Sequence, residues 1–149
     1  MHFDTSSELI SYAVKTKENA SYFYREAARH ASDDKSRELL EELAREELEH
    51  RDLFAGLDPE KGLLKLPKVL LDRKLSDSFV EVLFYPGMSF VEILMFAIKQ
   101  GEYACRLYLD LANSASGTVA TMLANFAEAE RQRRICLEEY FHLKVDSDL

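Results

Sequence analysis

The fold is decided by the stretch AVKTKENASYFYREAA at residues 13–28, because a similar stretch, AIKQGEYACRLYLDLA, occupies residues 97–112. The two share Ala, Lys, Ala, Tyr and Ala at positions that are all offset by 84 residues. Further along, Leu43-Ala44 with Glu47 matches Phe126-Ala127 with Glu130 at an offset of 83. The chain is therefore predicted to contain two copies of one structural unit.

Each copy contains two segments whose small and apolar residues recur at intervals of three and four, which is the spacing of one helix face. In the first copy these residues are Leu9, Ala13, Ala20, Tyr24, Ala27 and Ala28, followed by Leu39, Leu40, Leu43, Ala44 and Phe54. In the second copy they are Ile93, Leu94, Ala97, Ala104, Tyr108 and Leu111, followed by Leu123, Phe126, Ala127, Leu137 and Phe141. The sequence thus predicts an all-α protein built from two repeated helical hairpins.

Local signals place the ends of these helices. Capping boxes begin at Thr5 and Ser89, residues 32–34 can cap the second helix, and Gly56 can end it. We therefore expect a single domain over residues 1–149, with hairpin 1 at 5–56, a connector at 57–87 and hairpin 2 at 88–144. Residues 145–149 are expected to fray. A connector of about 30 residues suits a long crossover, and so a four-helix bundle.

Composition narrows the class of protein. The 149 residues are 47% hydrophobic and 31% charged, as in globular domains, and the formal net charge of −8 argues against a nucleic-acid or anionic-membrane surface. The first residues lack a signal-peptide pattern, and no uncharged apolar stretch approaches the ~18 residues of a membrane span. We expect a cytoplasmic protein in which Cys105 and Cys136 are reduced core thiols.

The chemistry-bearing motif lies on the second helix of each copy. Glu47-Leu48-Glu49-His50 is a Glu-x-x-His, and the matching place in the second copy is Glu130-Arg131-Gln132-Arg133. Spacing i, i+3 puts both side chains on one helix face, where they can reach the same metal ion. A buried carboxylate is costly unless it is paired or coordinates a metal, so Glu47 and Glu130 require one of these partners.

These motifs, together with Ala20 and Tyr24 in the first copy and Ala104 and Tyr108 in the second, resemble rubrerythrin-related members of the ferritin-like superfamily. The resemblance covers nearly the whole chain outside the connector and implies a ferritin-like bundle. In that family two helices each give one Glu and the other two each give Glu-x-x-His to a di-iron centre. The resemblance also implies that Tyr24 and Tyr108 bond to the central carboxylates, a role compatible with core packing.

The chain departs from the family pattern at three positions. The resemblance places glutamates at positions 17 and 101 and a histidine at position 133, where this chain has Lys17, Gly101 and Arg133. The ligands that remain are Glu47, His50 and Glu130. We expect Lys17 and Arg133 to form a salt-bridge network with the two carboxylates, with His50 hydrogen-bonded to it. The missing side chain of Gly101 is expected to make room for Arg133 or Lys17.

Two functions follow from this pattern. The first is a degenerate ferritin-like protein without di-iron catalysis, which binds one Zn, Fe or Mn ion weakly or no metal, and which acts as a binding or structural module. The alternative is an active non-haem iron oxidoreductase that reduces peroxide or oxidises Fe(II), with Glu18 and Glu102 turned inward as ligands. Each lies one residue past its expected place, which is a rotation of about 100° on a helix.

We expect the protein to form a homo-oligomer, most simply a dimer, and to bind neither nucleic acid nor membrane. The chain has no Cys-x-x-Cys iron centre, so a redox-active form would need an external electron donor. Phe84 and Tyr85 are candidate residues for a dimer surface, in line with the tendency of the family to form oligomers.

Overall fold

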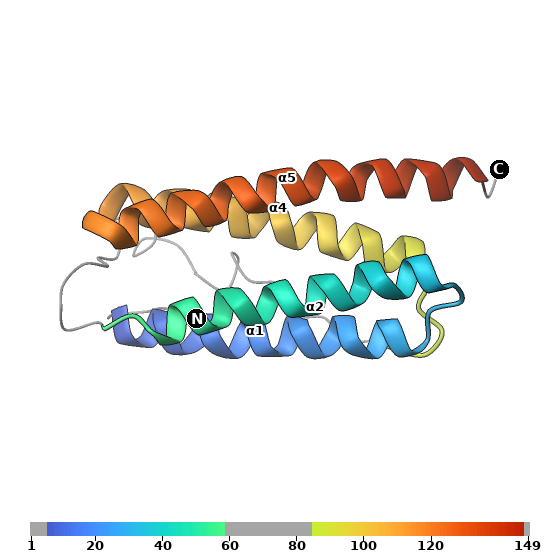
Figure 1. Cartoon of the computed structure of the whole chain (residues 1–149), viewed down its shortest axis with the longest axis horizontal. Helices are drawn as coiled ribbons and strands as arrows, with labels where there is room; N and C mark the ends of the chain where they lie inside the picture. The colour runs from blue at the N-terminus through green and yellow to red at the C-terminus, as the bar shows by residue number, and fades with distance from the viewer. Residues whose placement is uncertain (1–5, 59–84, 148–149) are drawn as a thin grey trace. The chain divides into compact units, whose positions relative to one another are not determined.

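The computed structural model describes residues 6–58 and 85–147, which form four α-helices (Figure 1). In chain order these are α1 (Ser6–Arg29), α2 (Asp34–Ala55), α4 (Phe90–Ser114) and α5 (Gly117–Ser147). Neither described range contains a strand, so the all-α prediction is confirmed there. The expected crossover falls largely on residues 59–84, which lie outside the described residues, as does the predicted cap at Thr5.

The chain divides into two compact units. One includes Ser7–Leu57 and therefore α1 and α2, and the other includes Val91–Leu149 and therefore α4 and α5. Each unit contains one of the two predicted hairpins.

In the first unit, α1 and α2 run antiparallel. The hydroxyl of Ser21 donates to the carbonyl oxygen of Ala44 at 2.9 Å, and Lys17, one turn earlier, pairs with Glu47, which comes later in the chain. The predicted cap is confirmed: Asp33 is the N-cap of α2, and its carboxylate accepts from Ser36 N at 2.7 Å. This bond satisfies one of the amide groups that a helix start leaves without an intrahelical partner.

The core of this hairpin consists mainly of the residues that the helical spacing predicts. Leu9, Ala13, Ala20, Tyr24, Ala27 and Ala28 of α1 are all buried, as are Leu40, Leu43, Ala44 and Phe54 of α2. Small residues recur on the α1 face, and they permit the close approach at which a Ser21 hydroxyl reaches a backbone carbonyl of α2.

The second unit repeats the antiparallel arrangement. The thiol of Cys105 on α4 donates to the carbonyl oxygen of Ala127 on α5 at 3.4 Å. Three residues later, the ring of Tyr108 packs edge-on against Phe126, with centroids 5.5 Å apart. The turn between the helices ends at Gly117, whose φ of 59° lies in the left-handed region that glycine adopts without strain.

Two expectations about this hairpin are wrong. Residues 145–147 continue α5 rather than fray, because no Gly or Pro interrupts the helix there and Lys144 lies in its last turn, where a cation is favourable. Cys136 is exposed rather than in the core, while Cys105 is partly buried, and both thiols are free. Burial raises the pKa of the Cys105 thiol, which keeps it protonated.

None of the helices in the described ranges has an apolar run long enough to cross a bilayer.

Candidate functional site: two buried ion pairs

The first ion pair joins α1 to α2. Lys17 Nζ lies 3.1 Å from Glu47 Oε2, and each residue is only 2% exposed. Both positions lie on the apolar faces of their helices, where an isolated charge would be strongly disfavoured. The cation and the carboxylate therefore stabilise each other in the interior of the hairpin, and removing either one leaves the other uncompensated.

His50 lies one turn after Glu47 on the same face of α2 and is 6% exposed. Burial lowers the pKa of His50 to about 3, and the positive charge of Lys17 acts in the same direction. The imidazole is therefore neutral at physiological pH, with one ring nitrogen as a donor and the other as an acceptor. Lys17, Glu47 and His50 together form a buried cluster with no net charge.

The second ion pair lies on α5. Glu130 is 2% exposed, and its Oε1 lies 3.7 Å from Nη1 of Arg133, whose side chain is 14% exposed. This distance is within the range of an ion pair but longer than a hydrogen bond. Arg133 thus compensates the charge of Glu130, as predicted. The two residues are three apart on α5, which is about one helical turn.

Gly101 on α4 faces this carboxylate. A Cβ atom added at Gly101 would meet Glu130 Oε2 at 3.4 Å. The expectation that Arg133 makes use of the space beside Gly101 is wrong, because the carboxylate of Glu130 borders that space and the guanidinium does not. A side chain at position 101 longer than Ala would displace the Glu130 carboxylate.

Gly101→Ala is expected to raise the free energy of unfolding by about 0.5–1 kcal/mol, because Ala has the higher helix propensity and 3.4 Å is an ordinary contact. Gly117→Ala is the matched control, and it should be destabilising because φ is 59° there. Urea unfolding followed by circular dichroism measures both changes. A loss of stability in Gly101→Ala would mean that Glu130 cannot yield to a methyl group.

Glu18 and Glu102 are not brought to the buried carboxylates. The Glu18 side chain is 50% exposed, and its Oε1 lies 3.5 Å from Nη1 of Arg51 on the surface of the first hairpin. Arg51 also binds the Asp52 carboxylate at 2.8 Å. Glu102 is exposed on α4. The shifted ligand set therefore requires both glutamates to leave the positions that they hold in the structure.

Tyr24 and Tyr108 occupy equivalent core positions in the two hairpins. Tyr24 is 2% exposed and Tyr108 is fully buried. Tyr24 packs edge-on against Phe23 at 5.3 Å, and Tyr108 packs in the same way against Phe126. These ring contacts are sufficient to explain why both tyrosines are buried, and they do not depend on what the hydroxyl groups bind.

Of the two candidate residues for a dimer surface, the structure describes Tyr85. Tyr85 is exposed, as a surface contact requires, whereas Phe84 lies outside the described residues.

The side chains present do not fit a di-iron centre. The carboxylate of Glu47, a metal ligand by the family pattern, has an ammonium group 3.1 Å away, and position 101 has no side chain to offer. Among the residues that the structure describes, no three His, Cys, Asp or Glu side chains are grouped so as to hold a metal ion. A divalent cation beside Lys17 would also meet electrostatic repulsion.

Further buried polar residues were not predicted from the sequence. Thr16 and Gln100 are 3% and 6% exposed, and each immediately precedes one of the altered positions, 17 and 101. They are themselves offset by 84 residues, so the internal repeat could have identified them as a pair. Ser21 is fully buried as well, and its bond to Ala44 holds the two helices of hairpin 1 at this level.

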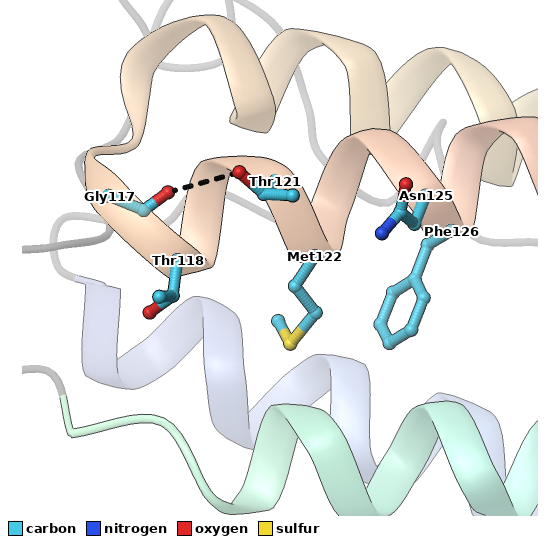
Figure 2. Close-up of a pocket in the computed structure, with 6 residues that line it drawn as sticks. All are labelled: Gly117, Thr118, Thr121, Met122, Asn125 and Phe126. Atoms are coloured by element: carbon cyan, nitrogen blue, oxygen red, sulfur yellow. Dashed lines mark hydrogen bonds between the residues drawn. The ribbon is translucent and has the colours of Figure 1, made fainter.

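A separate pocket of about 680 Å³ lies along the first turns of α5 (Figure 2). Its lining consists of Gly117, Thr118, Thr121, Met122, Asn125 and Phe126, with the hydroxyl of Thr121 donating to the Gly117 carbonyl oxygen at 3.5 Å. Figure 2 shows Thr118, Met122 and Phe126 projecting from the same side of the helix. None of the six lining residues is ionisable in the physiological range, so this lining offers no general acid or base.

Comparison with family models, with curated proteins and with solved structures gives no match for this chain.

Proposed function

We propose that this protein is a rubrerythrin-related, ferritin-like bundle that does not perform di-iron chemistry and serves as a binding or structural module. The observation that carries the proposal is the Lys17–Glu47 ion pair, 3.1 Å long and buried inside hairpin 1. The resemblance assigns a ligand glutamate to position 17, and a lysine there supplies the positive charge that a metal ion would otherwise supply.

The second hairpin supports the same proposal. Its Glu130 has Arg133 one turn away, at the position where the resemblance assigns a histidine ligand. Gly101 stands where the resemblance assigns a glutamate, and a carboxylate there would meet the carboxylate of Glu130. In each hairpin the buried glutamate is thus balanced by a cation of the chain itself, so that neither carboxylate needs a metal for its burial.

The proposal includes the cytoplasmic setting expected from the sequence, in which the two free thiols stay reduced. It treats active non-haem iron chemistry as the alternative, and that alternative would need both the shifted ligands Glu18 and Glu102 and an external electron donor.

Metal content after loading tests the proposal. The native chain is incubated anaerobically with Fe(II) or Zn(II) and desalted, and the metal is counted by mass spectrometry alongside Glu47→Gln and the exposed control Glu49→Gln. We expect the native chain to retain no more metal than Glu47→Gln. Two irons per chain, lost only in Glu47→Gln, would establish the oxidoreductase alternative, and one metal per chain would establish a three-ligand site.

A further inference from the structure

A groove of about 540 Å³ lies between α4 and α5. All of its lining residues belong to the unit that contains these two helices. Pockets of roughly 300–1,000 Å³ that combine apolar walls with a few polar groups are the usual sites of small ligands. Lys17, Glu47 and Glu130 are not among the lining residues, so this candidate site is independent of whether the buried glutamates bind metal.

The groove changes in character along its length. On α4 its lining runs from Met95 to Glu102, and on α5 it runs from Glu138 to His142. Because the two helices are antiparallel, residues late in α5 lie beside residues early in α4. Phe141 is therefore on the side of Met95, and Glu138 is on the side of Glu102. One end of the groove is mainly apolar, and the other end carries charge.

The apolar end offers surface that a ligand could cover. Met95 is 55% exposed, Ile98 and Phe141 are half-buried, and Phe96 is 9% exposed. The ring of Phe141 packs edge-on against His142, with centroids 5.8 Å apart. The unbranched thioether of Met95 can adapt to ligands of different shape. A large apolar side chain bound here would remove this surface from water, which is favourable.

The charged end presents two opposite charges side by side. Lys99 and Glu102 are both exposed, and they lie three residues apart on one face of α4, with about 5–6 Å between their Cβ atoms. The third charged residue of the lining, Glu138, has Nε of Arg134 3.9 Å away from its carboxylate, which offsets part of its charge. A neighbouring cation and anion are complementary to a zwitterion and not to a single ion.

We infer that the groove binds a free α-amino acid with a large apolar side chain. The ammonium group of the ligand binds the Glu102 carboxylate, and its carboxylate binds the Lys99 ammonium. Its side chain packs against Met95, Ile98 and Phe141 at the apolar end. A purely cationic or anionic ligand would satisfy one of the two charged groups and place a like charge beside the other, which disfavours it.

L-Phenylalanine and three related compounds test the inference by NMR titration of the isotope-labelled chain, followed at the amide groups of α4 and α5. We expect a dissociation constant on the order of 1 mM for L-phenylalanine, because the ligand has few atoms, so the titration extends to about 20 mM. L-Phenylalanine amide lacks the carboxylate, N-acetyl-L-phenylalanine lacks the ammonium group and L-alanine lacks the large side chain. Each should bind at least about fivefold more weakly than L-phenylalanine.

Two variants assign the charged contacts. Glu102→Gln should abolish the preference for L-phenylalanine over its N-acetyl form, and Lys99→Gln should abolish the preference over the amide. Lys15→Gln and Glu41→Gln are matched controls, since they make the same changes at exposed positions of hairpin 1 and should bind like the native chain.

Three results would overturn the inference. The first is that L-phenylalanine at about 20 mM leaves the groove amides unchanged. The second is that the amide binds as tightly as L-phenylalanine, which would point to a cation or the amino terminus of a peptide as the ligand. The third is that both Lys99→Gln and Glu102→Gln keep the native preferences among the compounds.

Discussion

Lys17→Met is expected to lower the free energy of unfolding by about 3–5 kcal/mol, because it leaves the Glu47 carboxylate buried without its cation. Glu47→Met should have an effect of similar size, since it leaves the Lys17 ammonium uncompensated. The double variant Lys17→Met/Glu47→Met removes both charges and replaces them with apolar groups, so it should lie close to the native chain in stability. Urea unfolding at pH 7 measures all three.

The control for this cycle is Lys15→Met, which removes an exposed lysine from the same helix and should change stability by no more than about 0.5 kcal/mol. The cycle compares the sum of the single losses with the loss in the double variant. Additive losses, with the double variant less stable than either single variant, would show that the two charges do not compensate each other in the folded protein.

The second large effect is a loss of stability in acid that depends on His50. Its pKa is about 3 in the folded protein and about 6.5 in the unfolded chain, so the unfolded state takes up a proton first. The contribution of neutral His50 is therefore complete above pH 6.5 and is lost progressively as the pH falls toward 3. At pH 4 the loss should amount to roughly 3 kcal/mol.

His50→Gln isolates this effect, because it keeps a polar side chain of similar reach but cannot be protonated in this range. The free energy of unfolding is measured from pH 7 to pH 4 for both proteins. The native curve should fall more steeply, with the difference between the curves opening below pH 6.5. Parallel curves would show that His50 is protonated as easily in the folded protein as in the unfolded chain.

The helices and their buried faces could be predicted because they depend on local spacing and on the internal repeat. The offset of 84 residues pairs Tyr24 with Tyr108 in the sequence alone, and both are core residues. Asp33 can be recognised as a cap from its residue type, and it makes the expected bond to Ser36. The Lys17–Glu47 pair could be predicted because a buried carboxylate needs a compensating partner, and Lys17 is a cation on the buried face of the neighbouring helix.

The positions of individual side chains outside the buried helix faces could not be predicted from the spacing of residues. The occupant of the space at Gly101 depends on rotamers of Glu130 and Arg133 that the order of residues does not determine. Cys136 is of a residue type that is common in cores, yet its position on α5 turns it to the surface.

Lys17→Glu tests most directly whether Lys17 occupies the place of a metal in hairpin 1. The substitution replaces the cation with a carboxylate on α1, facing Glu47 and close to neutral His50. We predict that Zn(II) at 100 times its dissociation constant raises the free energy of unfolding of Lys17→Glu by about 2.7 kcal/mol, and so raises its melting temperature or folds it if the metal-free form is unfolded. The native chain and Lys17→Gln should not respond. Equal responses of all three proteins to Zn(II), or no response in Lys17→Glu, would contradict this role of Lys17.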